Sequence, residues 1–257
     1  MTDAAEDDAY CADSVRRHDA DRWLAALFVP EARRRHVMAL YALDAELARA
    51  RDSVSEALLD EMRFSWWGES IASAMAQAPL AHPVARALAR AAGAIALDRG
   101  TFDALIAARS RELDPTPPAD MAAWTEHAEA SAVGLMRLAA RFANDRPLPR
   151  DADPALRYAG LAIALADAAG DHSAGARRLA LPPGLGKPGM VALAADHLAL
   201  ARAHSAAVPR EVLPILWPAT IKGLRLARLR RDPGKATRIG LPHKFLTLQW
   251  AAWRRRF

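Results

Sequence analysis

Apolar residues recur at helical spacing through nearly the whole chain, and the pattern breaks at clusters of proline or glycine. This spacing places apolar side chains along one face of a helix, whereas a half-buried strand requires strict alternation. Ala and Leu dominate the 52% of residues that are apolar, and β-branched and aromatic residues are few. That balance also favours helices. The sequence therefore predicts an all-α fold, a compact bundle of about nine or ten helices.

The breaks in the pattern divide the chain into segments. We expect helices over residues 30–51, 55–77, 82–97, 101–113, 118–142, 154–169, 188–204, 209–230 and 241–253. The main interruptions, at residues 115–118, 144–154 and 181–188, have the composition of loops. They are typical of connectors between helices, so we expect a single domain over residues 1–257.

Cysteine content and the N-terminal sequence indicate the cellular compartment in which the protein is expected. Cys11 is the only cysteine, so the chain cannot form an internal disulfide. The N-terminal residues are acidic and polar, whereas a secretory signal begins with basic residues and an apolar stretch. No window approaches the roughly 20 apolar residues that a membrane span requires. We therefore expect a cytoplasmic protein that does not cross a bilayer.

The net charge of +5 is unevenly distributed. Residues 222–257 contain eleven Lys and Arg against the single acid Asp232, or +10, which leaves −5 for the residues before them. Nucleic-acid binding would need a recognisable motif or stacking platform beside these cations, and we find none, so we expect no nucleic-acid partner.

Basic residues near the C-terminus alternate with aromatic ones, which is typical of segments that lie along an anionic membrane surface. A purely solubilising basic face is the alternative. The first interpretation places the protein peripherally on the inner face of a membrane. We expect the residues that contact the membrane or a partner to be Arg225, Arg228, Arg230, Arg231, Trp250 and Trp253.

The sharpest local pattern is Asp167-Ala-Ala-Gly-Asp171, followed by Arg177, Arg178 and Leu181-Pro182. Carboxylates four residues apart stand one above the other on a helix face, so Asp167 and Asp171 can share a hard cation. Mg²⁺ suits such a pair, because it takes one or two carboxylates and completes its shell with water and phosphate oxygens. Paired acids at this spacing are also common on solvated helix faces, so the pattern alone is a weak signal.

Several further segments, in the same order, resemble the squalene/phytoene synthase family. They are Ala39-Leu40-Tyr41-Ala42-Leu43, Met62-Arg63-Phe64-Ser65-Trp66-Trp67, His82-Pro83-Val84, Ser131-Ala-Val-Gly-Leu-Met136 and the acidic pattern at Asp167. The resemblance implies an isoprenoid-synthase helical bundle with a central apolar cavity. Enzymes of this family join two prenyl diphosphates head to head, and two aspartate-rich helices hold Mg²⁺ against the diphosphates. The implied cavity-lining residues are Leu40, Tyr41, Val133, Leu135 and Met136.

The first aspartate-rich cluster of the family is degraded in this chain. Counted from Tyr41, its register falls on Ala48-Arg49-Ala50-Arg51-Asp52, so only Asp52 is left to join Asp167 and Asp171 as a metal ligand. Arg49 and Arg51 would repel divalent cations, although either can contact a phosphate directly. The implied diphosphate-binding residues are therefore Arg49, Arg51, Arg177 and Arg178.

Two further features weigh against a complete metal site. The family's Asp-x-x-x-Arg-Tyr stretch is replaced by Glu112-Leu-Asp-Pro-Thr-Pro-Pro118, which contains no tyrosine. Asp44 and Glu46 are no substitute for the lost carboxylates, because residues two apart project from different sides of a helix. We expect an ordinary polar role for Asp44.

The segment from Leu43 to Trp67, the stretch Leu224-Arg-Leu-Ala-Arg-Leu-Arg-Arg231 and Gln249-Trp-Ala-Ala-Trp253 are similar to one branch of the family. That branch is linked to assembly of respiratory complex I. The resemblance therefore implies a non-condensing or altered member that acts with a complex I subunit and binds an isoprenoid or lipid. One alternative is an active Mg²⁺-dependent prenyltransferase that condenses two prenyl diphosphates, and another is a membrane-surface scaffold. We assign no catalytic residue.

Overall fold

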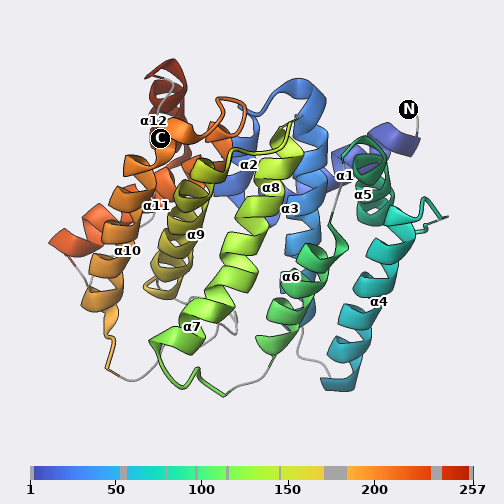
Figure 1. Cartoon of the computed structure of the whole chain (residues 1–257), viewed down its shortest axis with the longest axis horizontal. Helices are drawn as coiled ribbons and strands as arrows, with labels where there is room; N and C mark the ends of the chain where they lie inside the picture. The colour runs from blue at the N-terminus through green and yellow to red at the C-terminus, as the bar shows by residue number, and fades with distance from the viewer. Residues whose placement is uncertain are drawn as a thin grey trace.

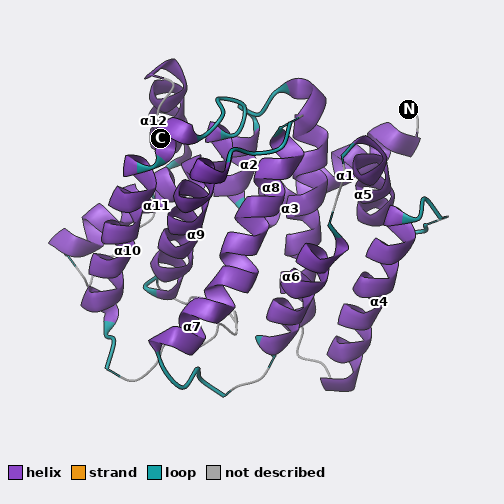
Figure 2. Ribbon diagram, viewed as in Figure 1, coloured by secondary structure: helices purple, strands orange, loops and turns teal. Residues whose placement is uncertain are grey.

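The computed structural model describes residues 3–52, 57–78, 80–95, 98–113, 116–144, 146–170, 184–232, 239–254 and 257. Every regular element within them is helical, and none of them forms a strand (Figures 1 and 2). The α-helices are α1 (Asp3–His18), α2 (Ala20–Ala26), α3 (Glu31–Asp52), α4 (Ala57–Met75), α5 (Pro83–Ala94), α6 (Arg99–Arg111), α7 (Met121–Ala128), α8 (Gly134–Ala143), α9 (Asp153–Ala168), α10 (Lys187–Ala203), α11 (Leu213–Arg231) and α12 (Leu241–Arg254). Three short turns accompany them, a π-helical η1 (Glu129–Val133) and the 3₁₀ turns η2 (Arg150–Ala152) and η3 (Ser205–Ala207).

The predicted all-α class and the helices after residue 30 are confirmed. The expected helix over residues 118–142 is divided into α7 and α8 by the π-helical turn η1. Two helices at the N-terminus, α1 and α2, were not expected. The side chains that α1 buries include Asp7 and Ser14 beside Cys11 and Val15, so its inward face does not form an apolar stripe. Asp7 is buried because it pairs with Arg86 and Arg90 of α5.

Helix α3 forms the centre of one half of the bundle. Residues 37–47 are buried apart from the half-buried Glu46, as expected for a helix that is covered on all sides. It packs against α1, α5 and α8, and it also contacts α2, α4 and α6. Helix α8 packs against α9 as well, which connects this half to the group formed by α9, α10 and α11 (Figure 1).

Helix α9 approaches η1 closely at Gly160. A β-carbon at this position would lie 2.8 Å from Val133 Cγ2 and 2.9 Å from Val133 Cα. Because backbone atoms cannot move aside as a flexible side chain can, only glycine allows α9 to approach η1 this closely. Val133 therefore lies in a packed interface, and this contact fixes α9 against one wall of the pocket described below.

The substitution Gly160→Ala is expected to lower the free energy of unfolding by about 1–3 kcal/mol, because the new methyl group overpacks the contact with Val133. Gly68→Ala in α4 is the matched control, since a β-carbon there meets nothing within 4 Å. Alanine has the higher helix propensity, so this control is expected to gain up to about 1 kcal/mol. Urea unfolding followed by circular dichroism measures both. Equal effects of the two substitutions would contradict the close approach.

Candidate functional site

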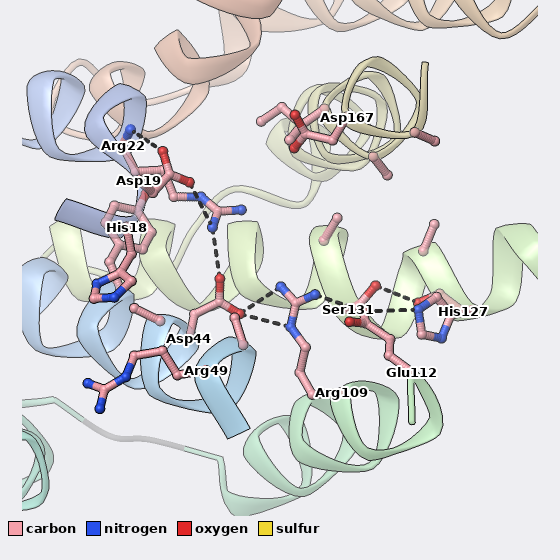
Figure 3. A pocket seen from close by; sticks show the side chains of 18 of the residues that line it. His18, Asp19, Arg22, Asp44, Arg49, Arg109, Glu112, His127, Ser131 and Asp167 are labelled. Atoms are coloured by element: carbon pink, nitrogen blue, oxygen red, sulfur yellow. Dashed lines mark hydrogen bonds and ion pairs between the residues drawn. The ribbon is translucent and has the colours of Figure 1, made fainter. Parts of the chain in front are cut away.

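A pocket of about 350 Å³ lies between α3 and α9 and is bordered by residues at the end of α1 and in α2, α6, α7 and η1. Its lining combines small apolar side chains with charged ones, whereas the expected cavity was apolar. The charged and polar residues come from all of these elements, and Figure 3 shows how they surround the pocket. They are His18, Asp19, Arg22, Asp44, Arg49, Arg109, Glu112, His127, Ser131 and Asp167.

Asp44 of α3 is the centre of a chain of buried ion pairs. Arg22 of α2 donates from Nη1 to Asp44 Oδ2 at 2.8 Å. Arg109 of α6 donates to Asp44 Oδ1 from Nε at 3.0 Å and from Nη2 at 2.7 Å. The carboxylate is 6% exposed, so both guanidinium groups meet it where water is largely excluded. The polar role expected for Asp44 is therefore that of a buried carboxylate shared by two arginines.

The chain of ion pairs continues from Arg109 to the end of α6. Arg109 Nη1 donates to Glu112 Oε1 at 2.8 Å, and His127 Nε2 of α7 lies 3.4 Å from the same oxygen. Ser131 in η1 donates to the backbone carbonyl of His127 at 2.8 Å. Glu112 begins the segment that replaces the family's Asp-x-x-x-Arg-Tyr stretch, and the structure places its side chain in the pocket wall.

The pKa of Asp44 reflects these contacts. Burial alone would raise it, but the positive charges of Arg109 and Arg22 outweigh burial and hold the pKa below its usual value. Burial would likewise lower the pKa of Arg109, and Asp44 and Glu112 instead raise it. The pocket wall is thus made of carboxylates and guanidinium groups that are ionised together and neutralise one another.

Asp167 of α9 lies across the pocket from Asp44, as Figure 3 shows. It forms an ion pair with Lys222 of α11, and Lys222 lies 3.8 Å from Asp21 Oδ2 of α2. Burial would lower the pKa of Lys222, but the negative charges of Asp167, Asp19 and Asp21 raise it above its usual value. The ammonium group therefore stays charged and neutralises the carboxylate that the acidic pattern identified.

Among the residues predicted to line the cavity, Tyr41 lies in the pocket wall. Leu40, Val133, Leu135 and Met136 are buried in the core and do not line this pocket. Their assignment to an apolar cavity stays a prediction, because the pocket described here is lined largely by charged residues.

The register of the first aspartate cluster does reach the pocket. Ala48 and Arg49 line it, with Ala48 at the first position of the cluster. Arg49 is half exposed, donates to Glu46 and points away from the buried ion pairs in Figure 3. The side chains of Arg51 and Asp52, and all of Asp171, Arg177 and Arg178, lie outside the part of the chain that the structure describes.

The described residues do not by themselves make a magnesium site. Among them, no group of three or more His, Cys, Asp or Glu lies close enough together to hold a metal ion. Mg²⁺ needs carboxylate oxygens that are not already neutralised. Asp44 is held by two guanidinium groups and Asp167 by an ammonium group, so neither offers such an oxygen in this arrangement.

The predicted basic surface is divided by the structure. Arg228, Arg230 and Arg231 are exposed on the last turns of α11, and Trp250 and Trp253 are exposed on α12. Arg225 is partly buried instead. Its guanidinium group occupies the space that a β-carbon at Gly170 would need, at the end of α9, so Arg225 is turned toward α9 and its role at the outer surface stays a prediction.

No helix within the described ranges combines the length and the hydropathy that a membrane span requires.

A family model described as squalene/phytoene synthase matches residues 15–182, more than half of the chain. The chain belongs to the squalene/phytoene synthase family. Two solved structures share the fold. A dehydrosqualene synthase in complex with ligand matches at a TM-score of 0.76 and 14% identity, over 98% of this chain and 97% of that one. Squalene synthase HpnC from Alicyclobacillus acidocaldarius matches at a TM-score of 0.76 and 18% identity, over 91% of this chain and 96% of that one.

The curated relatives in the family are complex I assembly proteins. NADH dehydrogenase (ubiquinone) complex I, assembly factor 6 from Homo sapiens is 28% identical over 144 residues, which is 56% of this chain and 43% of the relative. The Rattus norvegicus protein of the same name is 31% identical over 105 residues, 41% of this chain and 32% of the relative. The chain thus matches less than half the length of these relatives.

Two residues at the centre of this family member's site were missed by sequence reasoning. Arg22 and Arg109 lie 22 and 65 residues from Asp44 along the chain, and nothing near either one marks it as part of a pocket. The signal that could have found them was a lone acid on a helix with no basic residue at the three- or four-residue spacing that would pair with it locally. Such an acid, if buried, needs a distant partner.

Replacing Asp44 with alanine is expected to lower the free energy of unfolding by about 3–5 kcal/mol, because Arg22 and Arg109 then lose the buried carboxylate that they share and keep only Asp19 and Glu112 as ion-pair partners. Asp103→Ala is the matched control. Its pair with Arg99 is about half exposed, so its loss is expected to cost about 1 kcal/mol or less. Urea unfolding at neutral pH measures both. Similar losses in the two variants would show that the buried ion pairs do not hold the pocket together.

The contribution of Asp44 is also expected to depend on pH. Its folded-state pKa lies below the unfolded value of about 3.9, so the stabilisation is complete above that value and is lost as the pH falls through the folded-state pKa. The difference in free energy of unfolding between the wild type and Asp44→Asn is therefore expected to be constant from about pH 5 to 7 and to shrink below about pH 4. If this difference instead grew as the pH fell, the folded-state pKa of Asp44 would have to lie above the unfolded value, which would contradict the expected shift.

Proposed function

We propose that this chain is a non-condensing member of the squalene/phytoene synthase family that acts in the assembly of respiratory complex I. Its curated relatives from human and rat carry the name complex I assembly factor 6. The matched region covers less than half of the human protein, so a complex I subunit as the partner of this chain is proposed here as well.

The observation that carries the proposal is the neutralised pocket wall. Ionising an allylic diphosphate places negative charge on the leaving group, and divalent metals held by carboxylates lower that barrier by several kcal/mol. In this chain Ala48 occupies the first position of one aspartate cluster, and Asp44 and Asp167 are each paired with cations of the protein. This arrangement supports binding without condensation.

We further propose that the pocket binds an isoprenoid or another lipid with an anionic head group. Apolar side chains such as Ala45, Trp124 and Ile163 line part of the pocket and would accept an apolar chain. Arg49, half exposed on the rim, would contact the head group directly, as guanidinium groups do with phosphate. The volume of about 350 Å³ suits a single ligand better than two long prenyl chains.

The second candidate is an active Mg²⁺-dependent prenyltransferase. It is favoured by the position of Asp167 in the pocket and by the match over 98% of this chain to a dehydrosqualene synthase structure. In that case Mg²⁺ would have to be held by Asp167 together with Asp52 and Asp171, and Lys222 would have to release Asp167.

Deletion of the gene in its host is expected to lower the NADH:quinone activity of isolated membranes, and the wild-type gene is expected to restore it. Asp167→Asn should restore it too, because binding without condensation does not need a metal-bound carboxylate at this position. Arg150→Glu, at an exposed position on η2, is the control for a surface change. Immunoblots establish that each variant accumulates. Unchanged NADH:quinone activity in the deletion strain would refute the assembly role.

Incubating the purified protein with farnesyl or geranylgeranyl diphosphate and Mg²⁺ separates the two candidates. The proposed function predicts no C30 or C40 product. A condensed product that disappears in Asp167→Asn would establish the enzyme and overturn the non-condensing proposal.

A further inference from the structure

Helix α12 carries most of the large apolar side chains that the described part of the protein exposes. Eight such residues are exposed, and five of them lie on this one helix, between 39% and 79% exposed. They are Leu241, Phe245, Leu246, Trp250 and Trp253. At about 100° per residue, these five side chains occupy about half of the helix circumference. Isolated exposed apolar residues need no explanation, but a continuous face of them marks an interaction surface.

The orientation of α12 is fixed by its opposite face. Leu248 and Ala251 are buried against the bundle, where α12 contacts α11 and α2. Lys244 forms an ion pair with Asp21 of α2. These contacts hold the helix so that its apolar face points away from the bundle, and Figure 1 shows α12 at the edge of the molecule, on the side opposite α4.

The charge around this face has one sign. Residues 241–254 contain His243, Lys244 and Arg254 and no acid. The guanidinium group of Arg254 lies 4.3 Å from the ring centre of Trp250, so a cation borders the apolar face directly. Lys244 is paired with Asp21, so the α12 cation that borders the exposed face is Arg254, and Arg228, Arg230 and Arg231 add exposed cations at the end of α11. A partner surface must therefore accept inserted aromatic side chains and supply negative charge.

We propose that α12 docks the protein on an anionic lipid bilayer, with its apolar face in the headgroup region. A helix with tryptophan, phenylalanine and leucine on one face and cations beside it suits this interface, where apolar burial and attraction to anionic lipids act together. A second copy of the chain is a poor occupant of the same face. A symmetric dimer through α12 would bring two strongly basic surfaces together.

This docking does not depend on the proposed function, because it would hold for an assembly protein and for a prenyltransferase alike. The proposal also reduces the number of residues that are predicted to contact the membrane. Trp217 and Leu229, which also lie near the C-terminus on α11, are 3% exposed and cannot reach a bilayer. The aromatic residues that can insert are those of α12.

Vesicle flotation with the full chain tests the proposal. The wild type is expected to float with vesicles of phosphatidylcholine and phosphatidylglycerol, and to float far less with phosphatidylcholine alone. Binding should weaken toward 1 M salt, where the screening length falls to about 3 Å. The double substitution of Trp250→Ser and Trp253→Ser is expected to lower the partition coefficient about tenfold or more, since two large apolar side chains no longer leave water.

The matched control is the double substitution of Met62→Ser and Leu200→Ser, which removes two exposed apolar side chains outside α12. It should bind like the wild type. Bromine-labelled lipids provide a second readout, because they should quench tryptophan fluorescence in the wild type and much less in the Trp250→Phe and Trp253→Phe double variant. The proposal would be overturned if the wild type did not bind anionic vesicles, or if the control variant lost as much vesicle binding as the α12 serine variant. It would also be overturned if the wild type were a dimer that did not bind vesicles and that the α12 serine variant converted to a monomer.

Discussion

The carboxylate of Asp44 determines how the pocket half of the bundle is held together. A buried charge is strongly unfavourable unless it is paired and hydrogen-bonded. Asp44 meets this requirement with Arg22 from α2 and Arg109 from α6, and Arg109 extends the pairing to Glu112 and towards His127. The central helix α3 is thereby connected to α2 and α6 by buried charges, and Glu112 extends the connection toward α7. The shape of the pocket follows from these ion pairs as much as from apolar packing.

Much of the fold could be predicted from the sequence, because its helices after residue 30 bury apolar side chains at a regular period. Helix α1 could not be predicted in this way, for a physical reason. Its inward face includes Asp7, whose burial depends on Arg86 and Arg90 about 80 residues away, so the face has no apolar signature. The division at η1 was not predicted either, and it lies where Val133 meets Gly160 of another helix.

The candidate site could be predicted only where its residues form a pattern within a short stretch of the sequence. The acid pattern at Asp167 and the register that places Ala48 in the first cluster both concern residues that do line the pocket. The cations that pair with the acids could not be found in this way, because Arg109 and Lys222 reach them only through the packing of distant helices. Likewise, the basic and aromatic residues near the C-terminus predicted a membrane-facing surface, but only the packing distinguishes buried Trp217 from exposed Trp253.

The same ion pairs bear on what the pocket can do. A site that binds divalent metals must keep several carboxylates close together without cations of its own, and their mutual repulsion is relieved only when the metals arrive. This chain has the opposite arrangement, in which Asp44 and Asp167 are each neutralised by cations of the protein. Drawing a metal onto these carboxylates would require breaking their ion pairs, at a cost of several kcal/mol for each buried cation left unpaired. The carboxylates of this pocket are therefore satisfied by cations of the protein itself, and this arrangement favours the proposed non-condensing role over the ionisation of a diphosphate.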